Sequence, residues 1–409
     1  MIMTIQKRNF ILLWARSALT VAATTLTATG VLSGYLLWAG VGEQKIAFYQ
    51  SLVPLVNTVV SLLLSGYAAR VRNTVKAFGI SCVSMGILTM LYALLFLLDG
   101  KAPAFYPLLM VLGALLSVAS AIRNIFEYKM PCEVMDITEY SGYLSVNGIV
   151  GAVSGIGISA AASYCYKAFD FQTVSIAAFV LSGLLCLAAA LVNRFIIMIN
   201  PSENAESTDG KTNSSFAILR DRDFLILALP NTIRGIGEAV IAMITVLAVT
   251  DGIVQNTDGQ TITTITQIAT FISCILYGIL TPRLRAARVC MLGAATLTVL
   301  IAAFLTGRYT FFLLFGIAYI GYYTVSAALP DMIYQAVDQN IMSAFHTWRL
   351  AFMTAGNTAA TALIGTVVGK VPNIVIVTAG VVSFMIVSLA YYLLFGKRIM
   401  QGKPKRSAE

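Results

Sequence analysis

Charged residues are scarce in this chain, since Asp, Glu, Lys and Arg make up only 11% of its 409 residues. A soluble globular protein carries roughly 25% charged residues, because its surface must face water. Hydrophobic residues make up 58% of the chain, and the mean hydropathy is +0.83. This composition excludes an ordinary soluble domain and favours a protein whose outer surface faces lipid.

Residues that commonly carry catalysis or bind metals are also few. The chain has one histidine, and none of its six cysteines belongs to a Cys-x-x-Cys pair, so it lacks the usual patterns of a zinc or redox site. No nucleophile–base pair, Walker sequence or other nucleotide-binding segment is recognisable. We therefore expect neither an enzyme nor a primary pump, and no cofactor or metal.

The chain instead contains twelve long apolar segments separated by polar residues. About 20 apolar residues span a bilayer as a helix, and the ten-residue alternation of barrel strands is missing. The first segment follows Lys7 and Arg8 and is too long for a signal peptide, so we expect it to remain as a spanning helix. The predicted spans are 10–38, 45–69, 77–98, 104–123, 142–166, 172–198, 224–250, 261–281, 287–306, 309–329, 341–368 and 373–395.

A polar segment divides these spans into two sets of six. Asn200 to Ser215 is rich in Ser, Asn and Glu and has no apolar face to bury, so it predicts a flexible linker. The expected organisation is a six-helix bundle over 1–199, a cytoplasmic linker over 200–222, a second six-helix bundle over 223–396 and a cytoplasmic tail over 397–409.

The distribution of basic residues predicts the orientation. With both termini on one side, that side holds nineteen of the 27 Lys and Arg residues and the other side holds five. The excess of Lys and Arg in cytoplasmic loops then places both termini in the cytoplasm of a multi-pass protein of the cytoplasmic membrane. The net charge of +9 comes from these short loops, so no nucleic-acid partner is expected.

The two halves share landmarks at similar positions. They are Arg16 and Arg234, early in the first and seventh spans; Gly66 and Gly278, before basic clusters; and Pro131 and Pro330, after the fourth and tenth spans. Two six-helix halves joined by a cytoplasmic linker are typical of the major facilitator architecture, an all-α fold of twelve transmembrane helices in which the halves move around a central site.

Short motifs add a resemblance to known transporters. Gly66 to Arg72 with Lys76 is similar to the loop between helices 2 and 3 of the major facilitator superfamily, although the superfamily's Asp is missing. Within the superfamily, the chain most resembles the glycoside–pentoside–hexuronide:cation symporters, the melibiose-carrier group. The segments that carry this resemblance are Glu133-Val-Met-Asp136-Ile-Thr-Glu139-Tyr140, Pro330-Asp331-Met-Ile-Tyr334 and Phe352-Met-Thr-Ala-Gly356-Asn357.

The resemblance implies a sugar-like solute, but not sodium coupling. Members of this group coordinate their cation with two aspartates on helix 2, and the nearest positions here are Asn57 and Ser61. An amide and a hydroxyl are poor substitutes for carboxylates around a hard cation. We therefore expect a proton-coupled or facilitative carrier.

Charged residues inside the spans are the main candidates for a functional site, because a charge in the bilayer is costly and usually faces the bundle interior. Arg234 and Glu238 are four residues apart and share a helix face. Glu238 is a candidate proton-coupling group beside a substrate-binding Arg234. A permanent ion pair with no role in transport is the alternative.

A second group lies in the eleventh span. His346 and Arg349 are three residues apart, next to Trp348. Arg349 is a candidate for carboxylate or phosphate binding, Trp348 for stacking on a sugar ring, and His346 for coupling. The alternative is an interfacial position, where Arg reaches towards the headgroups and Trp anchors the helix.

The first half offers further candidates. Arg16 and Thr20 are candidates for substrate binding, as is Asn57 on the second span, although threonines in membrane helices also bond to their own backbone. Arg123 and Glu127, at the end of the fourth predicted span, line a cavity mouth or form a cytoplasmic ion-pair lock. The residues that we assign to gating are Arg123, Glu127, Glu133, Asp136 and Asp331.

The predicted function is secondary active transport. Three arginines against one glutamate in the interior favour an anionic solute, whereas the resemblance favours sugars, and a uronide satisfies both. The partners expected are a small-molecule solute, a coupling proton rather than sodium, and the lipid bilayer, with the chain acting as a monomer. The alternatives are a carrier or exporter of other organic anions or amphipathic compounds, and a membrane sensor that transports nothing.

Overall fold

Almost every residue that the structure describes is helical. The computed structural model describes residues 2–68, 71, 73–98, 100, 102–134, 140–199, 222–336 and 342–400. Within these ranges, twelve helical stretches are long and apolar enough to cross a membrane. The predicted all-α architecture with twelve spans is therefore confirmed.

The helices of the first half run from α1 to α7. Their bounds are α1 Ile2–Leu26, α2 Thr29–Trp38, α3 Glu43–Ala68, α4 Thr74–Leu95, α5 Phe105–Val134, α6 Tyr140–Ala168 and α7 Phe171–Asn193. The second half contains α8 Arg222–Ala228, α9 Pro230–Thr250, the short 3-10 helix η4 Asn256–Asp258, α10 Gly259–Leu284, α11 Ala286–Leu297, α12 Val299–Ala303, α13 Arg308–Ala336, α14 Met342–Val367 and α15 Asn373–Met400.

Three spans that the sequence predicts as continuous are divided, and the third of these is the ninth span, which is split into α11 and α12 at Thr298. The first is split into α1 and α2, where Ala28 has φ −54° and ψ 149° and so leaves the helical region. The seventh is split into α8 and α9, and α9 begins with Pro230. Proline suits the first position of a helix because the N–H that it lacks would have no intrahelical partner there. Hydropathy does not detect such breaks, because the apolar pattern continues through them.

Two predicted helix ends are wrong. Pro131 and Pro330 follow the apolar spans, which end at Glu127 and Leu329, but the helices α5 and α13 continue past these points and include both prolines. Arg123 and Glu127 likewise lie within α5 and not at its end. Hydropathy marks where the chain leaves the hydrocarbon, and a helix often continues beyond that point. A helix in a membrane protein also tolerates proline when neighbouring groups satisfy the freed carbonyl.

The two halves pack in the same way, helix for helix. In the first half α1 packs against α6 and α7, while in the second α9 packs against α14 and α15. The contact of α3 with α5 corresponds to that of α10 with α13. The contacts of α4 with α5 and α7 correspond to those of α11 with α13 and α15. This correspondence is the pseudo-symmetry of a duplicated six-helix bundle.

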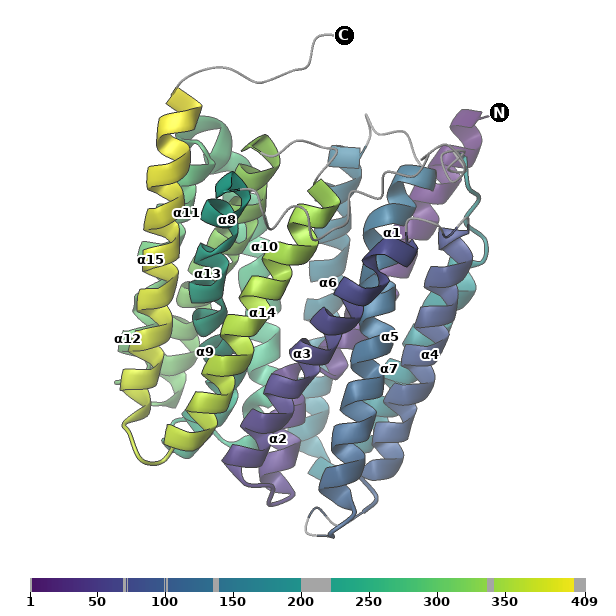
Figure 1. Cartoon of the computed structure of the whole chain (residues 1–409). Helices are drawn as coiled ribbons and strands as arrows, with labels where there is room; N and C mark the ends of the chain where they lie inside the picture. Colours follow the sequence, from purple (N-terminus) through teal and green to yellow (C-terminus); the bar gives the residue numbers. More distant parts are fainter. Residues whose placement is uncertain are drawn as a thin grey trace.

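The halves meet mainly where α3 packs against α14 and α6 against α10, and α2 adds contacts with α9, η4 and α10. Figure 1 shows the long helices running roughly parallel, with the start of α1 and the end of α15 at the same end of the molecule. An even number of spans places both chain ends on the same side of a membrane, as the sequence predicts.

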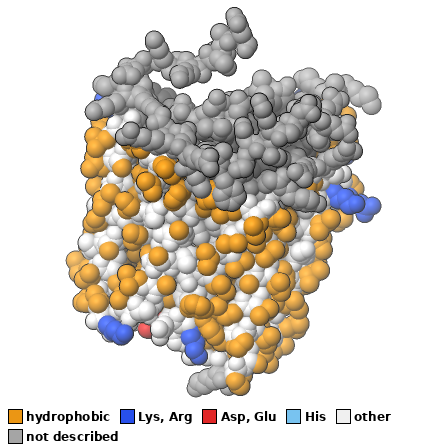
Figure 2. All heavy atoms as spheres, in the orientation of Figure 1, with side chains coloured by type: hydrophobic (Ala, Val, Ile, Leu, Met, Phe, Trp, Pro, Cys, Tyr) orange, Lys and Arg blue, Asp and Glu red, His pale blue; other side chains and the backbone are white. Residues whose placement is uncertain are grey.

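The outer surface is apolar between the two ends of the helices. Figure 2 shows hydrophobic side chains spread over the lateral face, with Lys and Arg gathered towards its ends. Large apolar residues such as Leu63, Leu94 and Leu313 are 75%, 60% and 66% exposed. A soluble protein rarely exposes so much contiguous apolar surface. This face is therefore suited to contact with the lipid of a membrane.

Candidate functional site

The main polar cluster inside the spans is built on α9 and α13. On α9, the Nε and one Nη nitrogen of Arg234 each lie 2.9 Å from the same carboxylate oxygen of Glu238. The two side chains are only 9% and 13% exposed. The spacing of four residues on one helix brings them together, as the sequence predicts. Each is largely removed from water, so solvent screens their attraction weakly.

Residues of α13 complete the hydrogen bonds of this pair. The hydroxyl of Tyr322 donates to the second carboxylate oxygen of Glu238 at 2.6 Å. Arg234 donates through an Nη nitrogen to the Ser326 hydroxyl at 3.1 Å. Both carboxylate oxygens therefore have donors, which offsets the cost of keeping a carboxylate away from water.

A group of tyrosine rings surrounds the α13 side of the cluster. The ring centroids of Tyr319, Tyr322 and Tyr323 lie 5.0 to 5.4 Å apart. Tyr322 also meets Phe384 edge to face, at 5.5 Å. The site thus combines a charged pair with aromatic faces and hydroxyls, which is the usual make-up of a small-molecule site in a largely apolar pocket.

Arg349 belongs to the same region. Asn231 donates to the Tyr391 hydroxyl at 2.6 Å, and both Arg234 and Arg349 lie within electrostatic reach of that hydroxyl. Arg349 is 8% exposed, and Trp348 packs against the main hydrophobic core. Arg234, Glu238 and Arg349 therefore all lie inside the second half, and both arginines act on Tyr391.

Arg16 lies apart from this cluster, inside the first half. It is 2% exposed, and its guanidinium lies 4.2 Å from the ring centroid of Phe78. One Nη nitrogen is 3.4 Å from the side-chain oxygen of Asn193 and 3.3 Å from the sulfur of Met130. These contacts connect α1 to α4, α5 and α7.

The other candidates of the first half also make local contacts. The Thr20 hydroxyl donates to the carbonyl of Arg16 at 2.8 Å, which is the backbone bonding common for threonine in membrane helices. The Asn57 amide donates to the carbonyl of Ser117 on α5 at 3.5 Å. Neither contact connects these residues to the cluster on α9 and α13.

Arg123 and Glu127 form an i, i+4 pair on α5, with 3.7 Å between Nε and Oε2. Arg123 also donates to Asn124 at 3.3 Å. Glu127 is 38% exposed, so the pair is weaker than the one on α9. Asp136 and the side chains of Glu133, Asp331 and His346 lie outside the described residues.

Close contacts between the halves occur at the end of the helices that is away from the termini, and they continue to the middle, where the Thr58 hydroxyl donates to that of Thr354 at 2.7 Å. A Cβ at Gly34 on α2 would lie 2.6 Å from the carbonyl oxygen of Asn256, and one at Gly365 on α14 would lie 2.6 Å from the Cβ of Ala47. The Ser163 and Thr261 hydroxyls are 2.9 Å apart. Glycine thus allows the halves to close on each other at this end.

Tyr322, Ser326, Asn231 and Tyr391 are the members of the cluster that the sequence analysis missed. Tyr319, Tyr322 and Tyr323 recur at intervals of three and four residues, which places them on one helix face. This spacing is a signal for a polar aromatic face within an apolar span.

The comparisons with known proteins agree with the fold. No protein-family model matches the chain, and no curated protein matches it in sequence. The chain is similar in structure to a point mutant of the nucleoside transporter NupG, with a TM-score of 0.67 and 16% identity over 97% of this chain and 100% of that one. It is also similar to a bacterial homologue of the human lysosomal transporter Spinster, in an inward-facing and unoccupied conformation, with a TM-score of 0.64 and 14% identity over 99% of both chains.

Both neighbours are transporters of the major facilitator type. At these identities the similarity defines the fold, and the chain has the major facilitator fold of two pseudo-symmetric six-helix bundles. The finer resemblance to the glycoside–pentoside–hexuronide group stays a prediction.

Proposed function

We propose that the protein is a secondary transporter that moves a sugar-like solute across the membrane by alternating access, with the solute bound at the Arg234–Glu238–Tyr322 cluster. The observation that carries this proposal is a largely buried, hydrogen-bonded ion pair inside a spanning helix of a major facilitator fold. Ionisable residues within membrane spans are costly and commonly mark a transport pathway.

The make-up of the cluster supports a solute with hydroxyl groups and a ring. The carboxylate of Glu238 accepts hydrogen bonds, Arg234 donates them, and the rings of Tyr319 and Tyr322 offer flat apolar faces. Sugars are recognised by this combination of polar groups and aromatic faces. A nucleoside belongs to the same class, because it is a glycoside with a flat base, and NupG is a nucleoside transporter.

The charges of the cluster weaken the case for an obligatory anion. Arg234 is balanced by Glu238 at 2.9 Å, and Arg16 packs inside the first half, away from the cluster. Of the interior arginines, Arg349 remains the candidate for a uronate carboxylate. Neutral glycosides therefore fit the cluster at least as well as uronides.

We further propose that a proton is the coupling ion and that Glu238 carries it. Protonation of Glu238 removes its charge and loosens its hold on Arg234, which then becomes available to the solute. Asn57, which replaces a carboxylate in the sodium-coupled relatives that the sequence resembles, donates to the Ser117 carbonyl. Proton coupling or facilitated diffusion is thus favoured over sodium coupling.

The contacts at Gly34 and Gly365 hold the halves together at the end away from the termini. With both termini in the cytoplasm, as the basic residues predict, this is the external end of the molecule. We also propose that the protein acts as a monomer in the cytoplasmic membrane. A carrier of other organic anions or amphipathic compounds, and a sensor without flux, are the competing functions.

Thermal unfolding of the purified protein in detergent tests the solute class. Neutral glycosides, nucleosides and uronides are compared at two pH values, with and without sodium, because a ligand that binds the native state raises the unfolding midpoint. We expect stabilisation by a glycoside or nucleoside without sodium, and a smaller stabilisation in a Tyr322→Phe variant. Stabilisation that requires sodium, or that occurs only with amphipathic compounds, would contradict the proposal.

A further inference from the structure

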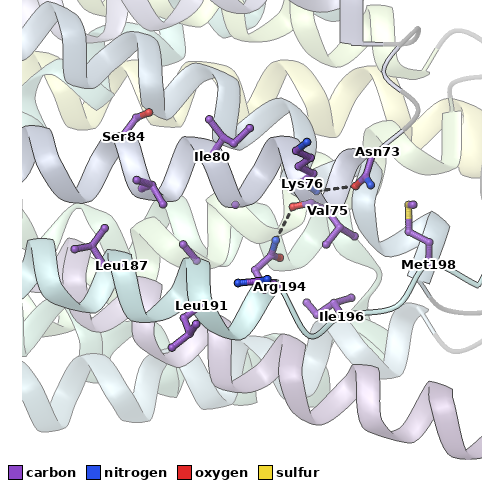
Figure 3. Close-up of a pocket in the computed structure, with 14 residues that line it drawn as sticks. Asn73, Val75, Lys76, Ile80, Ser84, Leu187, Leu191, Arg194, Ile196 and Met198 are labelled. Atoms are coloured by element: carbon purple, nitrogen blue, oxygen red, sulfur yellow. Dashed lines mark hydrogen bonds between the residues drawn. The ribbon is translucent and has the colours of Figure 1, made fainter.

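The outer face of the first half carries a depression that the proposed transport site does not use. It has a volume of about 720 Å³ and lies between α4 and α7, within the range of about 300–1,000 Å³ typical of ligand pockets. In Figure 3 Asn73, Lys76 and Arg194 lie towards one end, beside Val75, Ile196 and Met198, while Ile80, Leu187 and Leu191 lie further along and Ser84 lies at the other end.

A hydrogen bond between the two helices fixes the polar end. The side-chain nitrogen of Asn193, at the end of α7, donates to the carbonyl of Val75, at the start of α4, at 2.6 Å. Lys76 follows Val75 and Arg194 follows Asn193 in the chain. The hydrogen bond therefore keeps the two basic residues at a similar depth along the helices. Asn73 caps α4 by accepting from the Lys76 backbone N–H at 2.8 Å.

The two cations are available to a ligand. Both side chains are exposed, and no carboxylate in the described part of the chain lies within ion-pair distance of either. They stand where α4 begins and α7 ends, which are the limits of two predicted membrane spans. A pair of basic residues at this level meets the phosphates of the adjacent leaflet.

The apolar part of the depression extends from the cations towards the middle of the membrane. Ile80 and Leu191 are 59% and 58% exposed, and Gly79 also lines the depression on the α4 side, where an added Cβ would lie 3.4 Å from the side-chain nitrogen of Asn193, at van der Waals contact. A ligand that fits must therefore be anionic at one end and apolar along its length.

We propose that this depression is a binding site for an anionic phospholipid, whose phosphate is held by Lys76 and Arg194 and whose acyl chain lies along α4 and α7. The charge towards one end, the apolar side chains beyond it and the position at the membrane boundary all match this ligand. The site lies outside the Arg234–Glu238 cluster and does not depend on the identity of the transported solute.

Native mass spectrometry at low ionic strength tests the site, with phosphatidylglycerol and phosphatidylcholine of identical acyl chains as probes. The wild type should retain phosphatidylglycerol more tightly. Each cation near an anionic lipid contributes about fivefold to the affinity. The double variant with both Lys76→Gln and Arg194→Gln should therefore bind phosphatidylglycerol about 25-fold more weakly. The matched control is Lys167→Gln, Lys370→Gln, which removes two exposed cations at the other end of the helices and should bind as the wild type does.

A second variant tests the apolar part without changing the charge. Gly79→Leu fills the depression and should weaken binding of phosphatidylglycerol at least tenfold, whereas Gly157→Leu, on an exposed face of α6 with no atom within 4 Å of its Cβ position, should not. Excess glycerol 3-phosphate should not displace the lipid. Equal binding of the two lipids, equal loss in the control variants, unchanged binding in Gly79→Leu, or displacement by glycerol 3-phosphate would each overturn the proposal.

Discussion

Removal of the Glu238 carboxylate should destabilise the protein strongly, because it leaves a buried arginine without its counter-charge. Two nitrogens of Arg234 share one oxygen of Glu238 at 2.9 Å, and the arginine side chain is only 9% exposed. In a Glu238→Ala variant, Arg234 keeps its bond to the Ser326 hydroxyl, which carries no charge.

The expected magnitude follows from this burial. Breaking a buried ion pair by removing one partner costs about 3–5 kcal/mol, whereas replacing both partners with apolar residues of similar size is often neutral. Glu238→Ala should therefore cost about 3–5 kcal/mol of unfolding free energy, and Arg234→Met, Glu238→Leu should recover most of the loss.

The chain contains a matched control for this experiment. Arg123 and Glu127 have the same i, i+4 spacing, but they lie 3.7 Å apart and Glu127 is 38% exposed. Glu127→Ala should cost less than about 1 kcal/mol. Unfolding in detergent micelles, followed by circular dichroism, compares the variants. Two results would refute the reasoning. One is an equal loss of unfolding free energy in Glu238→Ala and Glu127→Ala, and the other is an Arg234→Met, Glu238→Leu double variant that is no more stable than Glu238→Ala.

Two further predictions concern the end of the molecule away from the termini. Gly34→Val should destabilise the protein by about 1–3 kcal/mol, because a Cβ there would lie 2.6 Å from the Asn256 carbonyl oxygen; thermal unfolding measures this, and an unchanged midpoint would show that the halves do not meet as described. Asp170 caps α7, and hydrogen bonds from the backbone N–H and hydroxyl of Thr173 hold the pKa of its carboxyl below the usual range. Its contribution to stability is therefore present above the unfolded-state pKa and is lost as the pH falls through the lower folded-state pKa. The unfolding midpoints of the wild type and Asp170→Ala should thus differ at neutral pH and converge in acid, and a difference independent of pH would contradict this.

The number and positions of the spans follow from sequence because hydropathy responds directly to the lipid environment. The predicted sixth span, 172–198, corresponds to α7 at Phe171–Asn193. The predicted ends of α5 and α13 come too early, because hydropathy marks only the end of the apolar stretch. Pro131 and Pro330 lie beyond that stretch, and both helices continue through them.

The candidate site was predictable only in part. The Arg234–Glu238 contact follows from a spacing of four residues on one helix. The contribution of Tyr322 and Ser326 depends on how α13 packs against α9, which one sequence does not specify. Arg16 shows the same limit: its partners Phe78 and Asn193 come from two other helices, so its burial inside the first half could not be read from the first span alone.

The most direct test of the proposed function is solute entry into proteoliposomes under an imposed pH gradient, with the glycoside or nucleoside that raises the unfolding midpoint most. The wild type and Glu127→Gln should accumulate the solute above its external concentration when the gradient is inward for protons. Glu238→Gln, which keeps the size of the side chain but does not titrate, should equilibrate the solute without accumulating it. Entry no faster than into protein-free liposomes would contradict transport, and accumulation by Glu238→Gln equal to that of the wild type would contradict coupling through Glu238.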